Sequence, residues 1–252
     1  MKNVKSSFSL LVFLLTVSCV VNLSQAQIRV AVASNFAKTA QELSHAFSEQ
    51  GNVEPILLIG STGKHAAQIA RGLPVDLFMA ADQQRPQYIE SIGLAVDNSR
   101  ITYAIGRLAF WVPGGSKKPN STLSVLLSQH KKIALANPKL APYGLASEQS
   151  IEYVMAQGEA TTKREPERLM GENIGQTFQF LNTGNVEAGF IAFSQVEGIP
   201  DDQLVLVPSN HHEPIEQQML ILRESQDVRG FYEFVLSELG KTIIRNNGYE
   251  TR

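Results

Sequence analysis

A glycine-rich turn with two hydroxyl side chains is the sequence feature that most restricts the fold. The apolar run at residues 55–59 predicts a buried strand, and it leads into Gly60-Ser-Thr-Gly-Lys64. The following residues, 65–71, predict a short helix that ends before Gly72. Glycines let backbone N–H groups approach a ligand closely, and a helix start adds free N–H donors and a favourable dipole. A strand, this turn and a helix together predict a cradle for an anion.

A second turn of the same kind lies upstream. Residues 28–33 alternate in the manner of a strand, and Ser34 and Asn35 follow them. Residues 36–49 then place apolar side chains at steps of three and four, as on one face of a helix. The alternative is that Ser34 and Asn35 only cap this helix, a position that both residue types favour. Beside the cradle at 60–64, we expect them to contact an anion.

Strand and helix patterns alternate along the rest of the chain. The predicted strands are 76–81, 101–112, 132–136, 188–193, 203–208 and 215–222, and the predicted helices are 82–92, 122–129, 145–157, 173–183, 227–239 and 240–246, with a charged loop at 159–168. Such a series favours parallel strands joined by helical crossovers. We expect an α/β fold of two lobes, each a mostly parallel sheet flanked by helices. Strands near 104–112 and 214–222 should cross between the lobes, and the ligand should bind in the cleft, at the carboxyl ends of the strands.

The first 26 residues are typical of a secretion signal. Two lysines precede an apolar stretch of 14 residues at 8–21, too short for a comfortable membrane span, and small residues precede Gln27. We expect cleavage after Ala26 and a periplasmic protein. A lipid anchor at Cys19, the only cysteine, is the alternative.

The remaining 226 residues are ample for a hydrophobic core and suit two lobes. We expect the first lobe at 27–106, the second lobe at 107–203, and a return crossing that completes the first lobe at 204–252.

The charge balance excludes two classes of partner. The chain has 22 Lys and Arg against 24 Asp and Glu, and removal of residues 1–26 takes two lysines and no acidic residue, so the net charge falls from −2 to −4. An acidic chain without a run of basic residues gains no long-range attraction to nucleic acid or to an anionic membrane. Local dipoles must therefore hold any anion.

An exported hydrolase is the alternative from another functional class. After residue 26 the chain has no cysteine, no Gly-x-Ser-x-Gly turn, no P-loop and no spacing typical of metal ligands. Asp76 and Asp82 lie too far apart along a strand to act together, and the adjacent His211 and His212 point in opposite directions. We therefore expect no enzymatic activity, no cofactor and no separate cation site. We expect Lys64 to be a solvated residue at a helix start.

Further motifs accompany the turn at 60–64. They are Ala31-Val-Ala-Ser34, Gln68-Ile69, Gly72-Leu-Pro-Val-Asp-Leu-Phe-Met-Ala-Ala-Asp82, Asn137-Pro138, Pro142-Tyr-Gly144, Glu172-Asn-Ile174 and Arg245-Asn-Asn-Gly-Tyr249. Together they resemble the periplasmic molybdate-binding proteins of ABC importers over essentially all of 27–252. The resemblance implies the type II periplasmic binding protein fold. It also implies a monomer that binds molybdate, and tungstate, and delivers it to membrane permease subunits.

The resemblance also implies six oxyanion contacts. They are Ser34, Asn35, Ser61, Thr62, Tyr143 and Ile174. The three side-chain hydroxyls of the two turns and the backbone amides of Asn35, Tyr143 and Ile174 would donate to the anion. The sequence does not decide between Ser61 and Thr62. Some relatives carry a tyrosine where this chain has Ala192, so the phenol of Tyr143 is an alternative donor.

These donors suit a fully deprotonated dianion. Molybdate and tungstate accept hydrogen bonds and donate none, so molybdenum would enter only as molybdate through the same residues. Phosphate carries a proton at neutral pH and is best bound by a site that includes an acceptor, so we expect it to bind weakly. A binding protein for another oxyanion, such as sulfate, phosphate or chromate, is the alternative.

Overall fold

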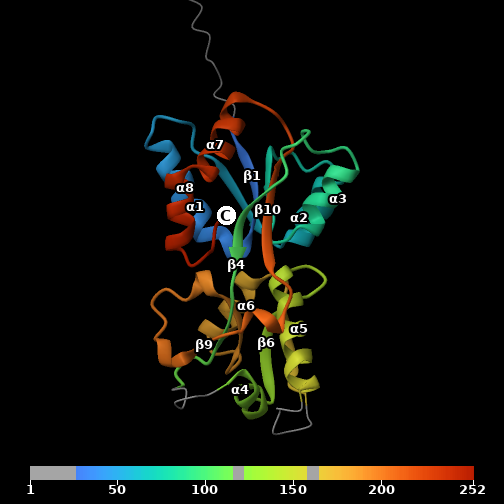
Figure 1. Ribbon diagram of the computed structural model, residues 1–252, viewed down its shortest axis with the longest axis vertical. Helices are drawn as coiled ribbons and strands as arrows, with labels where there is room; N and C mark the ends of the chain where they lie inside the picture. Colours follow the sequence, from blue (N-terminus) through green and yellow to red (C-terminus); the bar gives the residue numbers. More distant parts are fainter. Residues whose placement is uncertain (1–26, 116–121, 158–164) are drawn as a thin grey trace, which may run out of the picture.

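The computed structural model describes residues 27–115, 122–157 and 165–252. These residues form two lobes that lie one above the other along the long axis of the molecule, each built on a five-stranded sheet (Figure 1). The predicted secretion signal, its cleavage after Ala26 and the Cys19 anchor fall outside the described residues. In the described part of the chain, no helix is both long and apolar enough to cross a membrane.

The first lobe contains a sheet with strand order β2-β1-β3-β10-β4. Its strands are β1 (Arg29–Ala33), β2 (Ile56–Gly60), β3 (Leu77–Met79), β4 (Ile101–Gly106) and β10 (Ile215–Ile221). β1 is parallel to β2 and β3, whereas β10 is antiparallel to β3 and β4. Ala33 pairs with Gly60 at the ends of β1 and β2, so the two predicted anion turns leave the sheet at the same level.

Helices cover both faces of this sheet (Figure 1). The 3-10 helix η1 (Ser34–Phe36) leads into α1 (Ala37–Ser48), and the others are α2 (Thr62–Ile69), α3 (Gln84–Ser91), α7 (Gln226–Leu236) and α8 (Glu238–Asn246). Val30 and Val32 of β1 pack in the cluster that includes α1 and α7, whereas Ala31 packs with α2 and α3. Four consecutive apolar residues of β1 are buried rather than every second one, because the strand is covered on both sides.

The second lobe contains a sheet with strand order β7-β6-β8-β5-β9. Its strands are β5 (Leu108–Trp111), β6 (Lys132–Ala136), β7 (Glu167–Gly171), β8 (Gly189–Ala192) and β9 (Leu204–Leu206). Its α-helices are α4 (Leu123–Gln129), α5 (Pro142–Ala156) and α6 (Ile174–Asn182). The short 3-10 helices are η2 (Phe193–Gln195), η3 (Asp201–Gln203) and η4 (Ser209–His211). β6 is parallel to β7 and β8, and β5 is antiparallel to β8 and β9. Ala136 pairs with Gly171, so the chain leaves β6 and β7 at the same level too.

Two segments join the lobes. The chain passes from β4 of the first sheet to β5 of the second at Arg107, and it returns between β9 of the second sheet and β10 of the first. The prediction of one strand over 101–112 is therefore wrong, because β4 and β5 pair with different partners. The single residue between them keeps this joint short.

Two predicted boundaries in the second lobe also differ from the structure. The predicted charged loop at 159–168 overlaps β7, which begins with the polar residues Glu167 and Arg168. β7 lies at the edge of the sheet, where β6 is its only strand neighbour among the described residues. α5 begins at Pro142, three residues before the predicted start at 145. Proline is well suited to the first position of a helix, where its missing N–H is not needed.

Candidate anion-binding site

Four helix starts converge between the lobes. The first lobe contributes η1, which begins at Ser34, and α2, which begins at Thr62, and the second lobe contributes α5 and α6, which begin at Pro142 and Ile174. The first backbone N–H groups of a helix have no partner within the helix, and the helix dipole is positive at this end. The four helices therefore direct free donors and positive potential at one place.

A cavity of about 10 Å³ lies at this place. Its lining residues are Ala33, Ser34, Asn35, Gly60, Ser61, Thr62, Ala141, Pro142, Tyr143, Asn173 and Ile174. All six residues predicted from the sequence are among them, and they come from four separate segments of the chain. Such a cavity holds about one water molecule, so a tetrahedral oxyanion requires the lobes to separate slightly.

Ser61 and Thr62 differ in what their hydroxyl groups contact. The Thr62 hydroxyl oxygen accepts a hydrogen bond from the backbone N–H of Ala81 at 3.0 Å, at the end of β3. The Ser61 hydroxyl is buried and has no hydrogen-bond partner among the described residues. A buried hydroxyl without a partner is costly, so the whole Ser61 hydroxyl is free for a ligand, whereas Thr62 has its proton left to donate.

Ser34 makes a direct contact between the lobes. Its hydroxyl oxygen accepts a hydrogen bond from the backbone N–H of Gly175, in the first turn of α6, at 3.2 Å. Asn173 caps the same helix by accepting from the N–H of Gln176 at 2.9 Å. An anion between Ser34 and α6 would replace the Ser34–Gly175 hydrogen bond, because both groups can donate to it.

The side chain of Asn35 turns away from the cavity into a buried polar cluster. Its amide nitrogen donates to Gln217 Oε1 at 2.9 Å and to the Tyr249 hydroxyl at 3.0 Å. The backbone carbonyl oxygen of Asn35 accepts from the hydroxyl of Ser194, a residue of the second lobe, at 2.9 Å. The group that Asn35 has left for an anion is therefore its backbone N–H.

The phenol of Tyr143 is directed at the same cluster. Its oxygen accepts a hydrogen bond from Gln217 Nε2 at 3.4 Å, and burial raises the pKa of Tyr143 well above its usual value. The phenol therefore stays protonated at physiological pH. Because the phenol group is hydrogen-bonded to both Gln217 and Tyr249 of this cluster, the backbone N–H at the start of α5 is the donor that Tyr143 offers to the cavity.

Sequence reasoning missed four residues of this region. They are Gly175, Ser194, Gln217 and Tyr249. Tyr249 stood within a motif used for the family resemblance, but nothing indicated its contact with Asn35. β10 has three consecutive polar residues, Glu216, Gln217 and Gln218, so its sequence did not single out Gln217.

The comparisons with known proteins agree with this architecture. A family described as bacterial extracellular solute-binding protein matches residues 28–250. The chain belongs to this family.

Several relatives of this solute-binding protein have names that specify a ligand. It is 33% identical to the molybdate-binding protein ModA of Rhodobacter capsulatus over 228 residues, which cover 89% of this chain and 88% of the relative. It is 32% identical to ModA of Azotobacter vinelandii, with 89% and 90% covered. The structure of the Azotobacter vinelandii periplasmic molybdate-binding protein matches with a TM-score of 0.78 and 29% identity, covering 90% of this chain and all of that one. The predicted two-lobed periplasmic binding protein fold is thereby confirmed.

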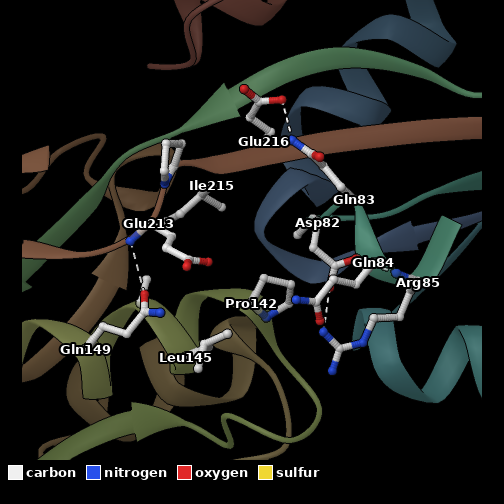
Figure 2. Close-up of a pocket in the computed structure, with 13 residues that line it drawn as sticks. Asp82, Gln83, Gln84, Arg85, Pro142, Leu145, Gln149, Glu213, Ile215 and Glu216 are labelled. Carbon is white, nitrogen blue, oxygen red and sulfur yellow. Dashed lines mark hydrogen bonds and ion pairs between the residues drawn. The ribbon is translucent and has the colours of Figure 1, made fainter. Parts of the chain in front are cut away.

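The small cavity and a larger one beside it differ in the charge of the residues that line them. None of the described residues that line the small cavity is charged. The larger cavity, of about 400 Å³, is lined by the carboxylates of Asp82, Glu213 and Glu216, and the Glu213 side chain extends into it (Figure 2). A dianion would be repelled there, so the small cavity is the better site for an anion although it is the smaller.

Asp82, one of the acidic residues of the larger cavity, has a structural role. Asp82 accepts from the backbone N–H of Arg85 at 3.0 Å and pairs with its guanidinium at 2.7 Å (Figure 2). Burial raises the pKa of Asp82, and Arg85 acts in the opposite direction. Asp82 therefore satisfies a backbone N–H in the first turn of α3. Asp76, at the other end of β3, accepts from the N–H of Arg29.

The remaining charged candidates lie outside the cavity. Lys64 pairs with Glu172 of the second lobe at 2.5 Å, and both side chains are about half exposed. His211 stacks on Tyr153 with ring centroids 4.2 Å apart. In the described part of the chain, no group of three His, Cys, Asp or Glu side chains is placed to hold a metal ion.

Proposed function

We propose that this protein binds molybdate between its two lobes, outside the cytoplasm, and delivers it to the permease of an ABC importer. The observation that supports this most strongly is the convergence of four helix starts and the free Ser61 hydroxyl on one uncharged cavity. Relatives at 32–33% identity are named for molybdate binding, and this supports molybdate as the anion. The predicted secretion signal at 1–26, with cleavage after Ala26, supports the location.

The donors of the cavity match what molybdate needs. Ser34, Ser61 and Thr62 supply hydroxyl groups, and the backbone of Asn35, Tyr143 and Ile174 supplies N–H groups. Each hydrogen bond to a charged group contributes roughly 1.5–3 kcal/mol, so a few of them offset the desolvation of a dianion and leave tight binding. Tungstate has the same charge and shape, and we propose that it binds as well.

Binding and release require the lobes to move. An anion would enter while Ser34 and Gly175 are apart, bind to the first lobe, and be enclosed as α5 and α6 approach. The joint at Arg107 and the return between β9 and β10 are the two segments about which such a hinge can bend. We propose that the closed monomer docks on the permease, which opens it.

A thermal-shift screen of the purified protein tests the proposal. Molybdate and tungstate at about 100 times their Kd should raise Tm by roughly 5–10 °C, because a ligand of the folded state stabilises it by mass action. Phosphate should have little effect, since none of the described residues that line the cavity has a carboxylate to accept its proton. A shift with sulfate or chromate but none with molybdate would assign the site to another oxyanion. No shift with any of these anions would overturn the proposal.

A further inference from the structure

We propose that Gln217 is a positioning residue that couples lobe closure to the anion site, so that the anion is released slowly. This inference rests on the proposed function. Gln217 lies on β10, the strand by which the chain re-enters the first lobe, and its side chain is fully buried. It contacts one residue from each half of the candidate site.

The amide of Gln217 has partners on both sides. Its oxygen accepts from Asn35 Nδ2 at 2.9 Å, and the Tyr103 hydroxyl lies 3.3 Å from the same oxygen. Its nitrogen donates to the Tyr143 hydroxyl at 3.4 Å. Asn35 and Tyr103 belong to the first lobe, whereas Tyr143 belongs to α5 of the second. One side chain therefore links the Asn35 side chain of η1 to the Tyr143 side chain at the start of α5.

A glycine on the neighbouring strand makes room for this link. A Cβ atom at Gly106, the last residue of β4, would lie 2.1 Å from the Tyr143 hydroxyl and 2.9 Å from Gln217 Nε2. Neither approach is possible for a side chain. Gly106 thus leaves space for the phenol of one lobe to reach the strand of the other, immediately before the joint at Arg107.

The contacts of Gln217 with Asn35 and with Tyr143 respond differently when the lobes move. The Asn35 contact lies within the first lobe and survives opening, whereas the Tyr143 contact crosses between lobes and is complete only when α5 is in place. Asn35 and Tyr143 both line the small cavity, and they are residues whose backbone N–H groups bind the anion in the proposed function. Gln217 therefore stabilises the closed arrangement in which both N–H groups are held at the cavity, and its loss should accelerate release more than it slows association.

The test replaces Gln217 and an adjacent glutamine in the same way. Gln218 is also buried, but it accepts from Arg100 at 2.9 Å and donates to Thr102 at 3.2 Å, both in the first lobe. Gln217→Met and Gln218→Met each remove one buried amide from β10. Dissociation of molybdate is followed by stopped-flow fluorescence, Kd by calorimetry and folding stability by urea unfolding.

We expect Gln217→Met to raise the dissociation rate about tenfold, the usual effect of losing a buried hydrogen-bond partner, with the association rate within about twofold. Gln218→Met should lower stability but leave the dissociation rate within about twofold. Tyr143→Phe, which keeps the backbone N–H, should also accelerate dissociation. Adding it to Gln217→Met should change the dissociation rate little, because both variants remove the same contact between the lobes.

Two outcomes would overturn the coupling, and they are distinguishable from failure of the proposed function. If the wild-type protein binds molybdate and Gln217→Met releases it no faster than Gln218→Met does, Gln217 is only a structural residue. If Gln217→Met does not fold, unchanged dissociation in Tyr143→Phe overturns the coupling by itself. A wild-type protein that binds no molybdate overturns the proposed function and the coupling together.

Discussion

Ser61 and Thr62 are adjacent hydroxyl residues with different partners, and the difference is testable. Ser61→Ala removes a buried hydroxyl that has no partner among the described residues, so the unliganded protein should keep its stability or gain slightly. If that hydroxyl donates to molybdate, the affinity should fall about ten- to a hundredfold. Calorimetry gives the affinity and urea unfolding the stability.

Thr62→Val is the companion variant, and it differs from Ser61→Ala in its expected effect on stability. It removes the oxygen that accepts from the Ala81 N–H and leaves that buried group unpaired, which should cost about 1–3 kcal/mol of stability. Unchanged molybdate affinity in Ser61→Ala would show that the Ser61 hydroxyl does not bind the anion.

His65 makes the stability of the first lobe depend on pH. The ring is buried directly behind the cradle, where a Cβ atom at Gly60 would lie 2.7 Å from Nε2, and burial lowers the pKa of His65. As pH falls through about 6.5, the unfolded chain binds a proton at this histidine before the folded protein does. The folded state therefore loses stability below this pH and is not affected above it.

Urea unfolding at pH 7.5 and 5.5 tests this behaviour. The free energy of unfolding should fall more between these pH values in the wild-type protein than in His65→Gln, which cannot titrate. His45→Gln changes a histidine whose side chain is 71% exposed and should retain the wild-type difference. An equal fall in all three proteins would assign the pH dependence to other groups.

For single residues, the sequence indicated which side chains lie near the site better than it indicated where those side chains point. Ser34, Asn35, Ser61 and Thr62 follow strands whose ends pair in register, so their proximity could be predicted. The turn of the Asn35 side chain toward Gln217 could not, because these residues are 182 positions apart and meet only through the order of strands in the sheet.

The start of α2 allows closure of the lobes to be tested separately from folding. Gly63 lies in the first turn of α2, and its N–H donates to the carbonyl oxygen of Leu140 in the second lobe at 2.9 Å. A Cβ atom at Gly63 would lie 3.1 Å from that oxygen and 3.2 Å from the Leu140 Cα atom. Alanine suits a helix better than glycine by roughly 1 kcal/mol, so Gly63→Ala should not destabilise the lobe itself.

Gly63→Ala should instead weaken molybdate binding by about tenfold, because the methyl group meets a backbone that cannot yield easily when the lobes close. Gly230→Ala is the control, since it also adds a methyl group to a helix, α7, where the nearest atom is 3.6 Å away on Phe47. Calorimetry and thermal unfolding should show reduced affinity without reduced stability for Gly63→Ala only. Equal affinities would mean that closure does not bring α2 and Leu140 together.

Most elements could be predicted because periodicity and glycine ends are local signals. β6 has its predicted bounds, 132–136, and α6 lies within one residue of its predicted bounds. The errors occurred where the deciding contact is distant. The division of 101–112 into β4 and β5 depends on which sheet each half joins, and β7 is recognisable by its pairing with β6 rather than by its sequence, which begins with Glu167 and Arg168.

For the whole molecule, contacts at the rim contribute little to closure. Lys64–Glu172 and Lys38–Glu197 both join the lobes, but each of the four side chains is about half or more exposed. Exposed ion pairs contribute about 0–1 kcal/mol. The buried contacts around Ser34, Asn35 and Gln217 must therefore determine how firmly the lobes close. The two lobes were predictable from the alternating pattern, whereas these contacts between them were not.

The overall charge predicts an unusual salt dependence of binding. The chain is acidic, with a net charge of −2, or −4 without residues 1–26, and molybdate is a dianion. Protein and ligand therefore repel each other at long range, and salt screens this repulsion over a Debye length of about 10 Å at 0.1 M. The donors at the cavity are buried and are screened much less. Salt should consequently affect approach more than release.

Stopped-flow measurements between about 0.01 and 0.3 M ionic strength should show an association rate that rises about twofold while the dissociation rate stays constant. Sodium chloride suits this experiment, because chloride does not have the charge or the shape of the ligand. An association rate that falls with salt would mean that the four helix starts attract the anion from a distance and outweigh the net charge. A dissociation rate that changes with salt would mean that the exposed pairs at the rim, rather than the buried contacts, hold the lobes closed.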